Sequence, residues 1–183
     1  MMGPVFWFVG LSGSGKTTLA EQTKKYLESN PDLFPGISRW EIIDGDSVRT
    51  FLDTEVGYTF EDRRKSVIIM GLLGFYLSKN NIGVIVANIS PFHDLRQKIR
   101  KKIPQYYEIF CQCPISTCIS RDPKGHYSNL LKNGIKDFVG HDIPFQVPEN
   151  PDLVVNTHKE TLTQCMETIS GFLKNVALKK VEK

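Results

Sequence analysis

One short run constrains this chain more than any other feature: Gly10 to Thr17, GLSGSGKT, which matches the pattern GxxxxGK[ST]. It follows an apolar stretch, Val5 to Val9, typical of a buried strand, and it leads into Lys16 to Ser29, whose apolar residues fall on one helical face. Glycines let backbone N–H groups turn inward around phosphate oxygens, and the helix N-terminus adds partial positive charge. The sequence therefore predicts a nucleoside triphosphate site, with an ordinary glycine-rich turn as the less favoured alternative.

The side chains of this loop have distinct expected roles. We expect Lys16 to reach the β- and γ-phosphates and to take part in catalysis, and the Thr17 hydroxyl to bind Mg²⁺. The loop residues expected to contact ATP are Gly10, Leu11, Ser12, Gly13, Ser14, Gly15, Lys16, Thr17 and Thr18.

Strand and helix patterns alternate along the rest of the chain. After the first strand, we expect four more: a short strand that ends with Ile42 and Ile43 at Asp44, and strands at 84–89, 107–113 and 153–155. A helix from about Glu61 to Lys79 is apolar nearly all round its middle and should be largely buried, and the last helix should open with a capping box at Thr157 and Glu160. This order predicts an α/β fold of the P-loop nucleoside-triphosphate hydrolase type, with a mainly parallel five-stranded sheet and helices on both sides.

A glycine- and proline-rich stretch, residues 122–148, has little periodicity of either kind. A loop of that length inside a compact unit is usually functional or mobile. We expect residues 1–183 to form one domain.

Composition excludes several classes of protein. The formal charge of +3 arises in the C-terminal stretch 174–183, so the sequence gives no sign of a nucleic-acid partner. The longest uncharged apolar run, Val67 to Leu77, is too short to span a bilayer. Four cysteines without zinc-ligand spacing favour a reducing, cytoplasmic setting.

An acidic pair, Asp44 and Asp46 in the run Asp44-Gly45-Asp46, follows the second expected strand. One carboxylate could orient or deprotonate an acceptor hydroxyl while the other holds Mg²⁺, and the sequence leaves open which does which. The alternative for Asp46 is an N-cap of the short helix that follows. The chain has neither the NKxD motif of GTPases nor an Asp ending its third strand, so a small kinase is favoured over a GTPase or a larger ATPase.

In its phosphate loop, its acidic pair and several further segments, the chain resembles the adenylylsulfate kinases (APS kinases). These enzymes use ATP to phosphorylate the 3′-hydroxyl of adenosine 5′-phosphosulfate (APS) and make the sulfate donor PAPS. The resemblance extends from about Val5 to Thr157. It rests on these segments: GLSGSGKTT at 10–18, DGDSVR at 44–49, GYTFEDR at 57–63, ISPF at 89–92, RDPKGHY at 121–127 and GIKDFVGHDIPFQVPENPDLVV at 134–155.

The resemblance implies roles for further residues. Arg49 and Arg63 match ligands of the phosphosulfate group, and surface ion pairing is their alternative. The resemblance implies that the stretch 122–148 is a lid over the nucleotides, that Arg121 and Lys124 stand at its beginning, and that Arg121 binds the nucleotide. Ser90 falls at the phosphoserine position of the family, although a hydrogen-bonding or turn-capping role is equally open. The substrate residues implied by position are Asp46, Arg49, Arg63, Ser66, Ile89, Ser90, Lys136 and Phe138, with Phe138 expected to stack on the base. Family members are commonly dimeric, so the resemblance implies a homodimer.

The chain departs from the family pattern near the acceptor. Ser66 stands where most members have Asn, Ile68 and Ile69 stand near the positions of two Arg, and His93 and Asn88 replace an Arg and an apolar residue. These changes leave two alternatives to APS kinase activity. One is phosphorylation of another nucleotide such as cytidine diphosphoramidate, and the other is a regulatory ATP-binding protein of weak activity.

Overall fold

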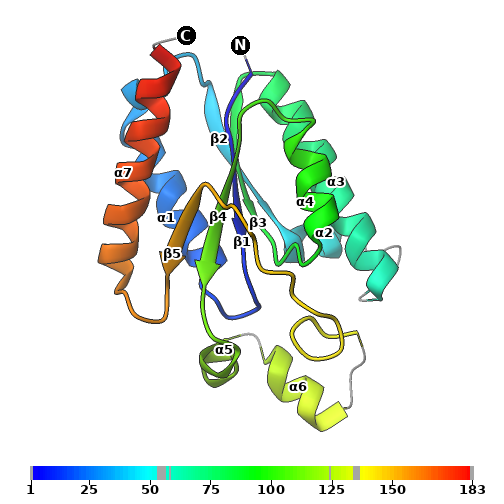
Figure 1. Ribbon diagram of the computed structural model, residues 1–183. Helices are drawn as coiled ribbons and strands as arrows, with labels where there is room; N and C mark the ends of the chain where they lie inside the picture. Colours follow the sequence, from blue (N-terminus) through cyan, green and yellow to red (C-terminus); the bar gives the residue numbers. More distant parts are fainter. Residues whose placement is uncertain (1, 53–56, 58, 124, 134–136, 182–183) are drawn as a thin grey trace.

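A parallel sheet forms the centre of the molecule (Figure 1). The computed structural model describes every residue except 1, 53–56, 58, 124, 134–136 and 182–183. In the described part, the sheet has five strands in the order β2-β3-β1-β4-β5, and every pairing is parallel. The strands are β1 (Val5–Val9), β2 (Arg39–Asp44), β3 (Ile82–Ala87), β4 (Tyr106–Gln112) and β5 (Leu153–Asn156). The predicted fold class is confirmed, and the third strand begins and ends two residues earlier than expected.

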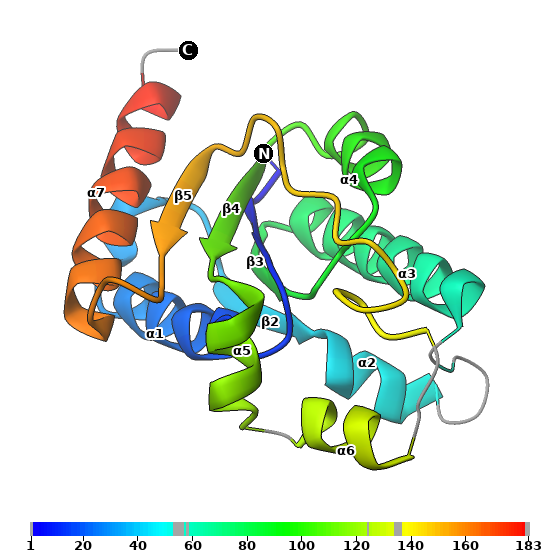
Figure 2. The ribbon, with the colours of Figure 1, turned by 60° about the horizontal axis from the view of Figure 1, so that its bottom comes forward.

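Helices cover both faces of the sheet (Figures 1 and 2). One face carries α1 (Lys16–Glu28) and α7 (Leu162–Val181), and the other carries α3 (Phe60–Lys79) and α4 (His93–Arg100). The shorter helices are η1 (Pro31–Leu33), α2 (Gly45–Leu52), α5 (Ile115–Arg121) and α6 (His126–Asn133). Figure 2 shows α2, α5 and α6 gathered at the carboxyl ends of the strands, the edge where ligands of open parallel sheets bind.

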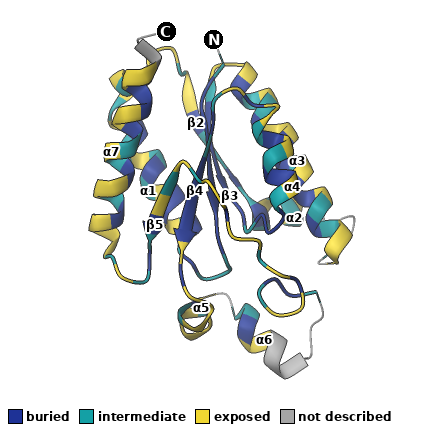
Figure 3. Ribbon diagram, in the orientation of Figure 1, coloured by how far each residue is buried: buried dark blue, intermediate teal, exposed yellow. Residues whose placement is uncertain are grey.

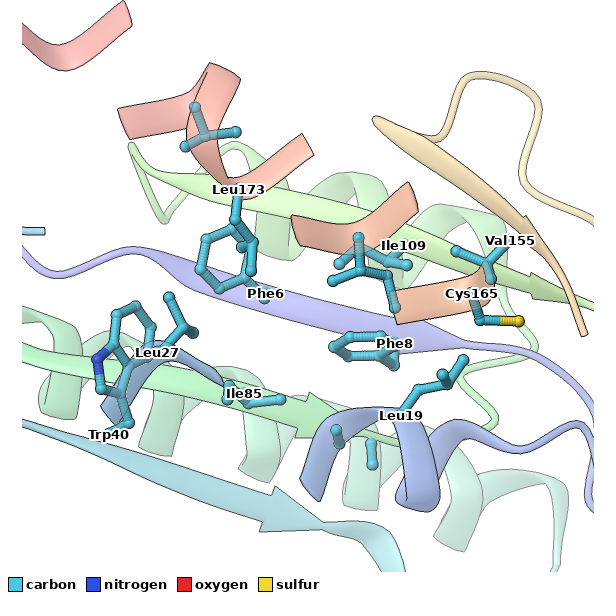
Figure 4. Close-up of a cluster of buried hydrophobic side chains, with 14 of the residues drawn as sticks. Phe6, Phe8, Leu19, Leu27, Trp40, Ile85, Ile109, Val155, Cys165 and Leu173 are labelled. Atoms are coloured by element: carbon cyan, nitrogen blue, oxygen red, sulfur yellow. The ribbon is translucent and has the colours of Figure 1, made fainter. Parts of the chain in front are cut away.

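The central strand β1 is apolar on both faces because each face meets a helical layer. Phe6 and Phe8 pack toward α1 and α7, where they contact a cluster that includes Leu19 and Leu173 (Figure 4). Trp7, between them in sequence, points the opposite way and packs with Val67 of α3 and its neighbours. Figure 3 shows the result, with buried residues along the strands and exposed ones on the outer sides of the helices.

The expectation that α3 is largely buried is wrong for its outer side. Ile68, Leu72 and Tyr76, spaced by four residues, keep 44%, 55% and 57% of their surface exposed. Helix α3 packs on the sheet and on α4 with one side only, so its apolar excess forms a stripe that faces away from both.

The predicted start of the last helix is also wrong. Helix α7 begins at Leu162, and the capping box is formed by Thr161 and Gln164: the Gln164 amide donates to Thr161 Oγ1 (3.3 Å) and the Thr161 amide to Gln164 Oε1 (2.9 Å). Thr157 is buried instead, and its hydroxyl lies within hydrogen-bonding distance of the carbonyls of Ser14 (2.9 Å) and Gln112 (3.3 Å). The Thr-x-x-Glu/Gln pattern occurs twice in this stretch. The second copy caps the helix, while the Thr157 hydroxyl of the first copy contacts the phosphate loop at the Ser14 carbonyl.

The expected lid stretch, 122–148, contains the short helix α6, which its composition did not predict. Among the described residues, no helix is both long and apolar enough to cross a membrane.

Candidate active site

The phosphate loop lies between β1 and α1, as predicted. Gly13 adopts φ 75°, and a Cβ there would lie 2.9 Å from the Cys118 carbonyl oxygen, so the tight turn requires glycine. Helix α1 has no side-chain cap at its N-terminus within the described chain. The partial positive charge at this N-terminus, beside Gly15 and Lys16, suits an anion. The Lys16 ammonium is nearly buried and donates to the Leu11 carbonyl at 2.7 Å.

The acidic pair stands beside this loop. Asp44 ends β2, where it accepts a hydrogen bond from the Thr17 hydroxyl (Oγ1 to Oδ2, 3.1 Å) and another from the Asp46 amide (2.9 Å). Asp46 forms an ion pair with Arg49 one turn along α2, with 3.3 Å between Oδ1 and Nη1. The Asp44 to Asp46 turn thus links the phosphate loop to the first arginine of the expected acceptor site.

These groups line one cavity of about 890 Å³ at the carboxyl edge of the sheet. The volume suits small-molecule sites of about 300–1,000 Å³. The predicted residues that line it are Ser12, Gly13, Gly15, Lys16, Thr17, Thr18, Asp44, Asp46, Arg49, Arg63, Ser66, Ile89, Arg121 and Phe138. Gly10, Leu11, Ser14 and Ser90 are not among the lining residues, and Lys124 and Lys136 lie outside the described residues.

The far wall of the cavity belongs to α3. Arg63 is nearly buried, and its Nε donates to the Asp137 carbonyl at 3.0 Å, which connects α3 to the segment that carries Phe138. Ser66 is 2% exposed, and its hydroxyl has no hydrogen-bond partner among the described residues. A buried hydroxyl that lines a cavity without a partner suits a polar ligand atom.

Ser90 lies behind the cavity wall, in a left-handed conformation with φ 45°. Its amide and its hydroxyl donate to Asn88 Oδ1 (2.7 and 2.9 Å), and its hydroxyl accepts from the Trp7 indole (2.9 Å). The side chain is fully buried. This arrangement favours the structural role that the sequence left open for Ser90 over attack on a phosphate, and a covalent role stays a prediction.

The lid stretch contacts the phosphate loop directly. The Tyr127 hydroxyl donates to the Ser12 carbonyl (3.1 Å), and its ring packs on Phe138 with 4.9 Å between ring centroids. Arg121 donates to the Thr157 carbonyl at 2.7 Å. The pKa of Asp122 lies below its ordinary value. Partial desolvation raises this pKa, but hydrogen bonds from the Ser128 hydroxyl and from the backbone amides of Ser128 and Tyr127 lower it by more. Asp122 therefore stays ionised and holds the first turn of α6.

Sequence reasoning missed several residues of this site. His126 and Asn129 of α6 line the cavity, as does Asn88 after β3, and Tyr127 supports the loop from outside. The sequence already shows that Asn88 replaces a residue that is usually apolar in the family. Its hydrogen bonds with Ser90 depend on a backbone turn that the sequence does not predict.

A family model described as adenylylsulphate kinase matches residues 2–156. The chain belongs to this family.

Individual family members agree closely with the chain. A probable adenylyl-sulfate kinase of Pseudomonas aeruginosa is 39% identical over 167 residues, which are 91% of this chain and 75% of the relative. An adenylyl-sulfate kinase of Clostridium kluyveri is 39% identical over 172 residues, 93% of this chain and 83% of the relative. Among solved structures, the Mycobacterium tuberculosis APS kinase CysC in complex with AMPPNP and APS superposes with a TM-score of 0.80 at 33% identity, covering 92% of this chain and 96% of that one. The adenylylsulphate kinase family therefore accounts for both the sequence and the fold.

Proposed function

We propose that this protein transfers the γ-phosphoryl group of ATP to the 3′-hydroxyl of adenosine 5′-phosphosulfate, giving PAPS and ADP, as a step of sulfate activation. The observation that carries the proposal is that two residues of the phosphate loop, Lys16 and Thr17, line the same cavity as Asp46, Arg49 and Arg63. A nucleotide triphosphate and a second anionic substrate can meet there. Family membership, and a relative described in complex with AMPPNP and APS, support this pair of ligands.

The phosphate loop would bind ATP through its backbone N–H groups and Lys16. In the structure, Lys16 donates to the Leu11 carbonyl, so binding would require its ammonium to exchange that oxygen for phosphate oxygens. Arg121 lines the same cavity and would add a permanent positive charge near the nucleotide.

Thr17 and Asp44 fit a magnesium ion. Their oxygens already lie 3.1 Å apart, and Mg²⁺ prefers one or two carboxylate or hydroxyl ligands together with substrate phosphates and water. When bound, the ion would neutralise charge on the β- and γ-phosphates.

Asp46 is our candidate for the group that orients and deprotonates the acceptor hydroxyl. Both oxygens of Asp44 already accept hydrogen bonds, from Thr17 and from the Asp46 amide, which leaves Asp44 better suited to the metal. The acceptor oxygen would pass its proton to Asp46 and bond to the γ-phosphorus as the bond from that phosphorus to the bridging oxygen of ADP breaks.

Arg49 and Arg63 would hold the phosphosulfate group, since their guanidinium groups offer forked donors to an anion. Ser66 and the backbone around Ile89 would complete this wall, and Phe138 would contact the base. Closure of the lid stretch over both substrates would exclude water and limit hydrolysis of ATP.

A coupled assay of ADP release tests the proposal. We expect APS to stimulate ADP release many-fold over ATP alone, and cytidine diphosphoramidate to give little or none. Turnover stimulated only by cytidine diphosphoramidate would overturn the acceptor assignment, and the absence of stimulation by either would overturn kinase activity.

We further propose that the protein forms a homodimer, through the exposed stripe of Ile68, Leu72 and Tyr76 on α3. Apolar side chains aligned at spacings of four residues are a common interface feature. Light scattering after gel filtration should give twice the chain mass for the wild-type protein. Leu72→Lys should give a monomer, and the control Leu178→Lys on the outer side of α7 should not.

Four buried cysteines without disulfide bonds support the cytoplasmic setting expected from the sequence.

A further inference from the structure

Arg96 of α4 is a buried cation that the proposed chemistry does not use. Only 1% of its surface is exposed, and it does not line the cavity. Its guanidinium contacts three separate parts of the chain. Nη1 donates to the Ser90 carbonyl (2.7 Å), Nη2 donates to the Gln146 carbonyl (2.8 Å), and Nε lies 3.3 Å from Glu108 Oε2 in an ion pair. A buried charge is costly, so its retention calls for a reason beyond packing.

The two carbonyls belong to segments that are far apart in the sequence. Ser90 lies in the turn after β3, where its neighbours Ile89 and Pro91 line the cavity. Gln146 lies near the end of the lid stretch, 122–148, behind that turn. The two segments also contact each other directly, because the Gln146 backbone amide donates to the Pro91 carbonyl (3.0 Å) and the His93 backbone amide donates to Gln146 Oε1 (2.6 Å).

The turn at Ser90 needs such support. A serine with φ 45° is in a conformation that non-glycine residues seldom adopt, and it persists only where its surroundings hold it. Asn88 and Trp7 hold the amide and hydroxyl of Ser90, and Arg96 holds its carbonyl. Arg96 is thus the one of these three groups that reaches both Ser90 and the lid stretch.

We propose that Arg96 is a positioning residue for the acceptor substrate, which joins the turn after β3 to the end of the lid stretch and so fixes the wall that Ile89 and Pro91 present. The inference rests on the proposed function, because it concerns the acceptor half of that site. Arg96 acts through the backbone and touches no substrate.

Glu108 of β4 balances the charge of Arg96. It is buried beside the Arg96 side chain, and its carboxylate also accepts from the Tyr106 hydroxyl at 3.3 Å. Burial raises the pKa of Glu108, and the positive charge of Arg96 opposes that rise. Removal of Arg96 alone would leave an unpaired buried carboxylate, which is strongly destabilising.

The informative variant is therefore the double substitution Arg96→Met with Glu108→Gln, which removes both charges and both carbonyl contacts. Glu108→Gln alone is the matched control, because it removes the carboxylate and leaves both carbonyl contacts of Arg96 in place, so it shows what loss of the ion pair does by itself. Arg100→Met is a second control: Arg100 lies one turn further along α4 and pairs with Asp152 at 2.6 Å. Arg96→Lys keeps a charge beside Glu108 but has one nitrogen in place of the two that reach the carbonyls.

Amide hydrogen exchange without ligands measures the connection itself. We expect the amides of Ser90, His93 and Gln146 to exchange about tenfold faster in the double variant than in Glu108→Gln alone, as the loss of charge-assisted hydrogen bonds implies, and to be unchanged in Arg100→Met. Arg96→Lys should fall between. Unchanged exchange in the double variant, or equal acceleration in Arg100→Met, overturns the proposal whatever the activity is.

Steady-state kinetics then tests the consequence. The double variant should raise KM for APS about tenfold while KM for ATP changes less than twofold, a difference that general loss of stability would not produce. An unchanged KM for APS, or equal rises for both substrates, overturns the positioning role. If the wild-type protein shows no turnover with APS, the proposed function fails. The exchange result alone then decides whether Arg96 joins the turn after β3 to the end of the lid stretch.

Discussion

Gly45 offers a direct test of how the ends of β2 and β3 fit together. An alanine Cβ at this position would lie 2.4 Å from Asn88 Nδ2, well inside normal contact, and 3.7 Å from the Ala87 carbonyl oxygen. The Asn88 amide has no easy way to turn aside, because its Oδ1 accepts from both the amide and the hydroxyl of Ser90. Gly45→Ala should therefore displace Asn88 and release Ser90.

The magnitude follows from the bonds that are lost. Two buried hydrogen bonds, at about 1 to 1.5 kcal/mol each, give a loss of about 2–3 kcal/mol. Alanine is the better helix former, and at the first residue of α2 it would recover about 0.5–1 kcal/mol. The net loss of about 1–2.5 kcal/mol corresponds to a fall in Tm of about 2–10 °C for a chain of this size.

A double-mutant cycle with Asn88→Ala separates this clash from other effects of alanine at position 45. Without the Asn88 amide in the way, Gly45→Ala should be neutral or stabilising by up to about 1 kcal/mol, so the two substitutions should couple by about 2 kcal/mol. Urea unfolding of the four proteins measures the coupling. Gly171→Ala in α7 is the control, since no atom lies within 4 Å of its added Cβ, and it should stabilise slightly. Equal destabilisation by Gly45→Ala in both backgrounds would refute the reasoning.

Three further outcomes are expected. Asp46→Asn should lower kcat by about 10²–10⁴ while the affinity for ATP, measured by titration, changes little; unchanged kcat would remove Asp46 from the mechanism. Tyr127→Phe removes the bond to Ser12 and keeps the ring on Phe138, so Tm should fall by about 2–4 °C and ATP hydrolysis without acceptor should rise relative to transfer; a ratio equal to that of the wild type would contradict a role in closing the site. Burial raises the pKa of Cys111 from its ordinary 9.0 to about 12, so the unfolded state loses this proton first as pH rises above 9. This thiol should then lower the free energy of unfolding by up to about 1.4 kcal/mol per pH unit between about 9 and 12, in addition to the effect of Cys118, whose pKa burial also raises to about 12. Cys111→Ala should reduce the total slope, and an identical slope in the variant would exclude the Cys111 thiol as a cause.

The features that the sequence predicted well are those specified by neighbouring residues. The phosphate loop needs glycines, a lysine and a threonine in one continuous run, and the buried strand before it is a run of five apolar residues. The acidic pair could be placed beside the loop because the carboxyl ends of parallel strands meet at one edge of the sheet. Local patterns of this kind leave few alternatives.

The features that it predicted badly depend on contacts between distant segments. Apolar residues on all sides of α3 predicted burial, but only packing decides which side meets the sheet, and the stripe that includes Leu72 stays exposed. Thr157 and Glu160 have the spacing of a capping box, yet the Thr157 hydroxyl lies against the Ser14 carbonyl 143 positions away. The hydrogen bonds from Arg96 to the carbonyls of Ser90 and Gln146 span 6 and 50 positions, and no periodic pattern in the sequence predicts them.

The phosphate loop itself combines both kinds of information. Two of its carbonyls accept hydrogen bonds from side chains of other elements: Tyr127 of α6 donates to Ser12, and Thr157 after β5 donates to Ser14. Because these carbonyls are held from outside, the peptide units between them are fixed in the orientation that turns N–H groups toward the site before any phosphate arrives. The motif thus specifies which residues can form the loop, while its rigidity depends on α6 and on the end of β5. The lid stretch contacts the phosphate loop through Tyr127 of α6, whereas Arg96 contacts it at Gln146, near its other end. The two substrates would therefore act on different ends of this stretch.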